Sequence, residues 1–325
     1  FTGGDGADAV SLGATTKAIT MGEGDDIVIS AGTVGTGGTV DAGAGTADKI
    51  IMTTVQAEAA DNSSTFNSKF TNFEVLEVSN ALAATANIDL DGINGASKVI
   101  LTTGGGHAST AILTNLVSGG TVQLDANTTG VTVGVKSALT SITDSLNLAI
   151  NATGVRTTTT FTAANVETIA INVADAATAG SAAVTHVIST LAANAATSIT
   201  VAGNNGLTIT AATGSVAVTS FDASGVVAND TTASAGVAAT TDTAANLAVT
   251  YTSVNATADA AVTITGGAGD DVLTGSAAAL NADTISGGAG ADTIIGGTGV
   301  DTLTGGEGAD TITGGLEADV INLTE

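Results

Sequence analysis

The chain has 325 residues, a formal net charge of −25 at pH 7 with only six Lys and Arg, and neither Cys nor Pro. This charge excludes nucleic acid as a partner, because a phosphate backbone needs a basic face. Without Cys there are no disulfides, and no run of about 18 apolar residues predicts a transmembrane helix.

Two glycine-rich units of nine residues stand at the start of the chain. GGDGADAVS begins at Gly3, and MGEGDDIVI runs from Met21 to Ile29; both have Asp at position six and Val at position eight. A third copy, AGAGTADKI, has one extra residue before Asp48. We therefore expect a short calcium-binding β-roll with two ions over residues 1–50.

The middle region, residues 51–262, is rich in Thr, Ala, Val, Asn and Gly and reads as a β-solenoid. Its 43% hydrophobic content (over the whole chain) argues against low-complexity disorder. A short helix is compatible with Val55–Asp61, and Asn204–Gly206 predicts a tight turn. Alternating residues predict strands at Ile169–Ile171, Ile199–Val201, Leu207–Ile209 and Val216–Val218.

The middle region also shows a faint duplication. The segment Asn72–Val78 resembles Asn165–Ile171, and Leu124–Ala126 resembles Phe221–Ala223. We expect two related solenoid stretches that carry different insertions.

The C-terminal region, residues 263–325, contains the most regular pattern. Nine-residue units begin at Gly266, Gly287, Gly296, Gly305 and Gly314, and the last four are contiguous. Glycine takes backbone angles that a side chain forbids, so GGxGx wraps tightly and turns its carbonyl oxygens inward. With the Asp carboxylate these oxygens form a hard cage that suits Ca²⁺. A flexible glycine linker would not hold its Asp and aliphatic residues in one phase.

Two nine-residue units should form one coil of a flattened roll. The turn at Gly287 is then expected to stack on that at Gly305, and Gly296 on Gly314, with calcium between stacked turns. Two departures are visible. The unit from Gly275 to Ser286 is three residues too long, which predicts a bulged coil, and Glu317 replaces the third glycine of the last unit, which makes that site doubtful.

The predicted metal ligands are the second and third glycines and the Asp of each unit. They are Gly4, Gly6, Asp8, Gly22, Gly24, Asp26, Gly267, Gly269, Asp271, Asp283, Gly288, Gly290, Asp292, Gly297, Gly299, Asp301, Gly306, Gly308, Asp310 and Asp319. The fold expected overall is all-β, with calcium-binding parallel β-roll segments at both ends and a β-solenoid between them.

Phe1–Ser30, the strand Asn72–Val78, Ser220–Ser224 and the closing nonapeptides together resemble the Caulobacter-type RTX surface-layer (S-layer) proteins. The nonapeptides alone are common to many RTX proteins exported by type I secretion. The resemblance implies an extracellular, calcium-dependent tile of a two-dimensional coat whose main partner is itself. Cell-surface polysaccharide would be bound through regions outside this chain. The resemblance implies ligand roles for Asp8, Asp26, Asp271, Asp292, Asp301, Asp310 and Asp319.

Both ends of the chain look cut: no signal peptide precedes Phe1, and no export signal is evident at the C-terminus. We expect a fragment or a processed form of a larger protein.

An enzyme is not expected. Neither His107 nor His186 lies in a zinc-protease HExxH motif, and no GxSxG element occurs. Both histidines are interpreted as surface or strand residues. The pairs Asp25–Asp26 and Asp270–Asp271 are better explained by their positions in the nine-residue calcium-binding repeat than by a catalytic role. An RTX adhesin segment, or the secretion-linked tail of an enzyme outside this chain, stays open as an alternative.

Overall fold

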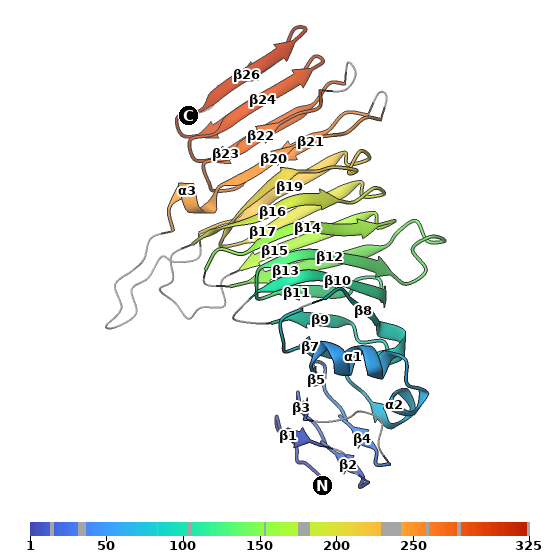
Figure 1. Cartoon of the computed structure of the whole chain (residues 1–325). Coiled ribbons are helices and arrows are strands. Elements are labelled where there is room, and N and C mark those ends of the chain that lie inside the picture. Colours follow the sequence, from blue (N-terminus) through green and yellow to red (C-terminus); the bar gives the residue numbers. More distant parts are fainter. Residues whose placement is uncertain are drawn as a thin grey trace, which may run out of the picture. The chain divides into compact units, whose positions relative to one another are not determined.

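The computed structural model describes residues 1–13, 16–31, 37–82, 84–102, 106–152, 154–174, 183–228, 242–257, 260–277 and 281–323. The chain divides into two compact units, Phe1–Ser141 and Ile142–Glu325. Each unit is built mainly from parallel strands (Figure 1), so the fold is all-β with a parallel roll or solenoid, as predicted. The three sequence regions 1–50, 51–262 and 263–325 stay a prediction.

The described strands of the first unit form three parallel sheets. One sheet contains β1 (Ala9–Leu12), β3 (Ile27–Ser30), β5 (Lys49–Met52), β7 (Val75–Val78), β9 (Lys98–Leu101) and β11 (Thr121–Leu124). A second contains β8 (Ala86–Asp89), β10 (His107–Leu116) and β12 (Thr128–Val135). The third contains the two-residue strands β2 (Ile19–Thr20), β4 (Val40–Asp41) and β6 (Phe70–Thr71).

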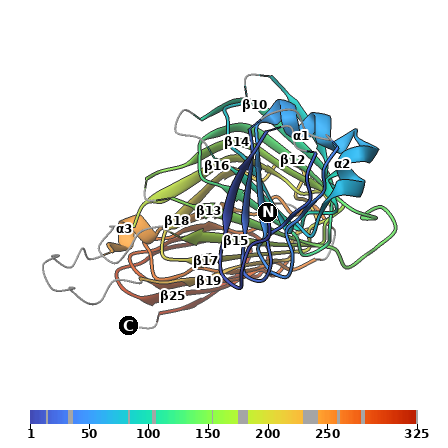
Figure 2. The ribbon, with the colours of Figure 1, turned by 90° about the horizontal axis from the view of Figure 1, so that it is seen from below.

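Short helices interrupt the coils of the first unit. They are α1 (Thr54–Asp61), α2 (Ser64–Lys69) and the 3₁₀ helix η1 (Leu90–Ile93). Thr53 begins α1 with a capping box, because its hydroxyl accepts from the Gln56 N–H and the Gln56 side chain accepts from the Thr53 N–H at 2.8 Å. The short helix predicted near Val55–Asp61 is therefore confirmed, and Figure 2 shows α1 beside α2.

The described strands of the second unit form two parallel sheets. One contains β13 (Ser145–Asn151), β15 (Thr168–Ala174), β17 (Ser198–Gly203), β19 (Ser220–Val226), β21 (Thr263–Thr265), β23 (Thr284–Ala289), β25 (Thr302–Glu307) and β27 (Val320–Asn322). The other contains β14 (Thr157–Ala164), β16 (Thr185–Ala192), β18 (Gly206–Ala211), β20 (Val249–Thr252), β22 (Val272–Thr274), β24 (Thr293–Thr298) and β26 (Thr311–Leu316). The short helix α3 (Ala244–Leu247) packs beside β18.

Two kinds of coil occur in the second unit. The coils of β13 to β20, which we call the plain coils, bury several large side chains; in β15, Ile169, Ile171 and Val173 are at most 2% exposed. Phe221 stacks on Tyr251 with ring centroids 3.9 Å apart. Residues 263–323, which we call the C-terminal repeats, bury one aliphatic side chain in each strand from β21 to β25, such as Ile285 and Ile294, and none in β26 or β27. Their interior is correspondingly thin.

Most strands predicted in the plain coils are present, but one is wrong. Ile169–Ile171, Ile199–Val201 and Leu207–Ile209 lie in β15, β17 and β18, whereas Val216–Val218 lies in a turn. The chain turns after Ser215, whose hydroxyl accepts from the Ala193 N–H, and Val216 is left exposed. Asn204 and Asn205 form the predicted tight turn, as a corner between two sheets.

The duplication suspected in the middle region has a structural counterpart. Asn72 and Asn165 both adopt left-handed backbones, with φ of 61° and 58°, just before strands β7 and β15. Two residues later, Glu74 and Glu167 each accept a hydrogen bond from a backbone N–H one coil earlier. The common origin of the two stretches stays a prediction.

Candidate metal centre

The strand register places the glycine-rich turns of the C-terminal repeats directly over one another. β23 pairs with β25 and β24 with β26, each at a spacing of 18 residues, so that Gly288 lies opposite Gly306 and Gly297 opposite Gly315. The predicted stacking of Gly287 on Gly305 and of Gly296 on Gly314 is confirmed. It follows because two nine-residue units complete one coil.

Glycine is required in these turns by close backbone contact. A Cβ on Gly288 would lie 2.3 Å from the carbonyl oxygen of Gly267, and one on Gly306 would lie 1.9 Å from that of Gly288. Both residues also have left-handed backbones. The same left-handed geometry is found at Gly290, Gly297, Gly299, Gly308 and Gly315, but not at Gly4, Gly6, Gly267 or Gly269 in the first turn of each array.

The Asp at position six of each unit joins successive coils. At one edge of the roll, Oδ1 of Asp271 accepts from the Val249 N–H at 2.7 Å. Oδ1 of Asp292 then accepts from the Asp271 N–H at 2.8 Å, and Oδ1 of Asp310 from the Asp292 N–H at 3.0 Å. We call such a series a carboxylate ladder. It satisfies backbone donors at the corner, where strand pairing ends.

A second carboxylate ladder follows the opposite edge. Oδ1 of Asp283 accepts from the Val262 N–H at 2.9 Å, Oδ1 of Asp301 from the Asp283 N–H at 2.8 Å, and Oδ1 of Asp319 from the Asp301 N–H at 3.0 Å. Asp283 keeps its place although its unit is three residues longer; the coil spacing from β21 to β23 is 21 residues. The lengthened coil is confirmed, while its residues 278–280 lie outside the described residues.

The second carboxylate oxygen turns back into the glycine loop. Oδ2 of Asp271 accepts from the Gly267 N–H and Oδ2 of Asp283 from the Ser276 N–H, both at 2.7 Å. Oδ2 of Asp292 and Oδ2 of Asp301 are buried and have no partner. A Cβ on Gly287 would lie 2.0 Å from Oδ2 of Asp292, so the first glycine leaves room for the carboxylate.

These orphaned oxygens fit a hard cation. Burial raises the pKa of Asp271 to about 7 and that of Asp292 to about 6, because a buried carboxylate loses its hydration. A divalent ion would restore the charged form, and oxygen-only donors favour Ca²⁺ over transition metals. Among the described residues no three Asp, Glu, His or Cys side chains form a metal cluster. Backbone carbonyls of the stacked turns would therefore complete the ligand set.

The N-terminal turns repeat this arrangement at one edge of the first unit. Asp26 accepts from the Asp8 N–H and Asp48 from the Asp26 N–H, both at 2.7 Å, and Glu74 accepts from the Asp48 N–H at 2.9 Å. Oδ2 of Asp26 and of Asp48 are buried without a partner, while Oδ2 of Asp8 accepts from the Gly4 N–H. The irregular third unit thus belongs to the ladder.

Sequence reasoning did not place Asp48, Glu74, Asp144 or Glu167 among the site residues. In the plain coils, Oε2 of Glu167 accepts from the Asp144 N–H at 2.8 Å, and Oδ2 of Asp144 is buried without a partner. No complete GGxGx turn marks these acids. Their one shared signal is position: each directly precedes a strand, namely β5, β7, β13 or β15.

The neighbouring acids have a separate structural role. Oδ1 of Asp25 accepts from the N–H groups of Thr46 and Ala47, and these bonds lower the pKa of Asp25. Oδ1 of Asp270 accepts in the same way from the Ala291 N–H at 2.8 Å. The first acid of each pair, Asp25 or Asp270, therefore caps the next turn.

The two histidines lie in strands, as one of the two predicted interpretations stated, but they are buried. His107 is 3% exposed in β10, and His186 is fully buried in β16. Nδ1 of each ring accepts a backbone hydrogen bond, from the N–H of Leu82 and Arg156 respectively. Burial, and next the charge of Arg156, lower the pKa of His186 to about 4. Both rings act as internal acceptors.

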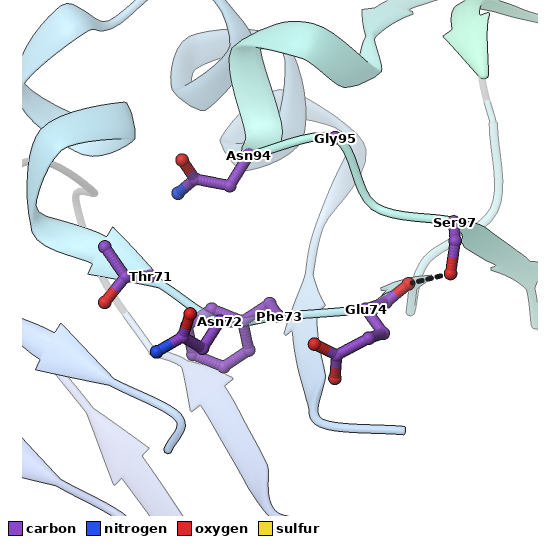
Figure 3. A pocket seen from close by; sticks show the side chains of 7 residues that line it. All are labelled: Thr71, Asn72, Phe73, Glu74, Asn94, Gly95 and Ser97. Atoms are coloured by element: carbon purple, nitrogen blue, oxygen red, sulfur yellow. Dashed lines mark hydrogen bonds between the residues drawn. The ribbon is translucent and has the colours of Figure 1, made fainter. Parts of the chain in front are cut away.

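A polar pocket of about 320 Å³ lies where the N-terminal ladder reaches Glu74. Figure 3 shows Asn94 and Gly95 on one side and Thr71, Asn72, Phe73 and Glu74 on the other, with Ser97 donating to the Glu74 carbonyl. Asn72 donates to the Asp41 carboxylate at 2.7 Å. The pocket lies where the glycine-rich turns end. In the coil that follows, Asn72 and Asn94 occupy left-handed backbone positions.

Comparison with known families identifies the repeats. The model of the family described as RTX calcium-binding nonapeptide repeat (4 copies) matches residues 259–279 and 286–321. No curated protein sequence matches the chain. The chain thus carries RTX repeats in a parallel β-roll, and these repeats bind Ca²⁺. RTX repeats are typical of secreted proteins. No helix among the described residues is long and apolar enough to cross a membrane.

Proposed function

We propose that the chain is a structural, calcium-dependent, self-assembling protein of the cell surface: a tile of a two-dimensional S-layer lattice. The observation that carries this proposal is the continuous stacking of parallel coils through calcium-binding turns. Such a solenoid presents extended sheet faces at fixed spacing, which suits a repeating coat. The resemblance of residues 1–30 and 72–78 to S-layer proteins adds to it.

Calcium would be held mainly by the carboxylates that have free buried oxygens. In the C-terminal repeats these belong to Asp292 and Asp301, and in the N-terminal turns to Asp26 and Asp48. When bound, the ion supplies positive charge that compensates buried carboxylates. The chain's own part is to point these oxygens into glycine loops and to exclude water from them. Folding of the glycine-rich turns is then coupled to ion binding, and an extracellular affinity on the order of 10⁻⁴ to 10⁻³ M would leave these turns unfolded in a low-calcium cytosol.

The proposal includes the absence of enzymatic activity. The two histidines are buried and bond to backbone groups, and the paired acids cap turns or join coils. These roles account for the groups that would otherwise suggest acid–base chemistry. The partner expected is a second copy of the chain, and export by type I secretion would deliver it outside the cell.

An RTX adhesin segment is the second candidate. The calcium-binding repeats fit it equally well, because they specify secretion and calcium rather than assembly. An adhesin would use the stacked coils as a rigid spacer and would stay monomeric in calcium.

Electron microscopy of the purified chain, with millimolar Ca²⁺ and with chelator, tests the proposal. We expect a regular lattice or filament in calcium that dissolves in chelator. Monomers that bind calcium and fold but never assemble would refute the lattice and favour the adhesin segment. Mg²⁺ at the same concentration is the matched control for a general effect of divalent charge.

A further inference from the structure

Glu317 stands where the nonapeptide has its third glycine, yet the last turn keeps the shape of the others. Glu317 adopts a left-handed backbone with φ of 72°, and Gly315, two residues earlier, has φ of 122°. Residues other than Gly, Asn and Asp seldom take this conformation. The side chain of Glu317 is therefore held at a place where the other turns expose only backbone.

One hydrogen bond differs between the two edges of the C-terminal repeats. The Gly290 N–H donates to the backbone carbonyl of Glu307 in the next coil, at 2.8 Å. Gly299 holds the equivalent position at the other edge, but its N–H donates to Oε2 of Glu317 at 3.1 Å. The Glu317 carboxylate thus takes the place of a backbone carbonyl between the turns 296–301 and 314–319.

An unsatisfied oxygen lies in the same pair of turns. Asp301 is fully buried; its Oδ1 accepts from the Asp283 N–H, and its Oδ2 has no partner. Oδ2 points back into its own loop, 2.5 Å from where a Cβ on Gly296 would lie. The carboxylates of Asp283, Asp319 and Glu317 are close enough to act electrostatically on that of Asp301. Negative charge therefore accumulates around this oxygen.

We propose that Glu317 is a side-chain ligand of a calcium ion held between the stacked turns 296–301 and 314–319. The stack of turns 287–292 and 305–310 has glycine at this position in both turns, so Glu317 would supply a carboxylate ligand that has no counterpart there. Calcium sites bind more tightly as the number of charged ligands rises. The departure from the repeat then strengthens the last site, contrary to the expectation from sequence. The inference does not depend on lattice formation.

Calorimetric titration of the full chain with Ca²⁺ tests the assignment. Glu317→Gln keeps an acceptor for the Gly299 N–H but removes the charge, and Glu317→Gly restores the repeat. We expect both variants to weaken one class of site about tenfold, because a ligand charge is lost. Glu307→Gln removes an equal charge from the neighbouring unit at a residue that is exposed, as Glu317 is, and should leave the affinities unchanged.

Three outcomes would overturn the proposal. Glu317→Gln could bind calcium like the wild type, which would make Glu317 only a hydrogen-bond acceptor. Glu317→Gly could bind more tightly, which would make Glu317 a misfit in the turn. Glu307→Gln could lose as much affinity as Glu317→Gln, which would show that calcium affinity depends on the net negative charge of the repeats and not on Glu317 as a ligand. Circular dichroism at saturating Ca²⁺ checks that every variant folds before its affinities are compared.

Discussion

The plain coils and the C-terminal repeats belong to one compact unit but keep their parallel strands together by different means. The plain coils bury several large side chains per coil, among them Ile171 and the stacked pair of Phe221 and Tyr251. The C-terminal repeats bury one aliphatic residue in each strand from β21 to β25 and place buried carboxylates at both edges. Parallel coils can thus be stabilised by burial of apolar side chains or by buried carboxylates whose negative charge a cation compensates. Chemical conditions should separate the two regions.

Calcium removal should give the largest difference. Each site loaded at a hundred times its dissociation constant stabilises the fold by roughly 2.7 kcal/mol, and several sites lie in the C-terminal repeats. In chelator we expect amides of residues 263–323 to lose protection from hydrogen exchange, while amides of β15 and β17 keep it. Mass spectrometry of peptides from both regions measures this. Uniform loss along the unit would show that the plain coils depend equally on the ion.

Acid should act on the plain coils through His186. Burial lowers its pKa to about 4 in the fold, from an ordinary value of 6.5. Above pH 6.5 both folded and unfolded states are neutral; as the pH falls towards 4 the unfolded state gains the proton first, so stability is lost. The loss amounts to about 3 kcal/mol at the acid end. The difference in melting temperature between wild type and His186→Gln, at pH 7 and pH 4.5, measures it. Parallel pH profiles would contradict the prediction.

Gly288→Ala should damage the C-terminal repeats by about 2 kcal/mol or more. The left-handed backbone disfavours Ala, and the new Cβ would lie 2.3 Å from the Gly267 carbonyl oxygen. Gly4→Ala is the matched control, because it changes the same position of the motif where the site for a Cβ is open. Urea unfolding in calcium compares them. Equal losses of unfolding free energy in the two variants would mean that the stacking of turns is not the reason glycine is required at Gly288.

Glu167→Ala should have the smallest effect, about 1 kcal/mol, because it removes the acceptor of the Asp144 N–H. Glu167→Gln keeps an acceptor and should cost less. Since this coil has no glycine-rich turn, the loss should be the same in calcium and in chelator. A loss that appears only in calcium would indicate that Asp144 and Glu167 belong to a further metal site.

The regular repeats could be read from sequence because their spacing and chemistry are local. The nine-residue period at Gly287, Gly296, Gly305 and Gly314 determined the strand register, and it was confirmed. The ladder acids Glu74 and Glu167 could not be found in this way. Glu74 accepts from an N–H 26 residues earlier in the chain, and Glu167 from one 23 residues earlier. No glycine motif near either acid predicts the contact.

Short alternation was a weaker guide than spacing. Val216–Val218 alternates like a strand but forms a turn, in which Val216 is 43% exposed and only Val218 is buried. Likewise, the histidines could be assigned to strands but not to the interior, since burial depends on the stacking of coils distant in sequence.

The carboxylate ladder has a consequence for how such a chain can change in evolution. Each acid fixes the alignment of its own coil on the preceding one, at intervals of 18, 21, 22 and 26 residues. A coil can therefore gain residues between its corners without displacing the coils after it. An insertion in one coil therefore leaves the register of the other coils unchanged. New surface loops can arise in single coils while the stacked strands keep their pairing.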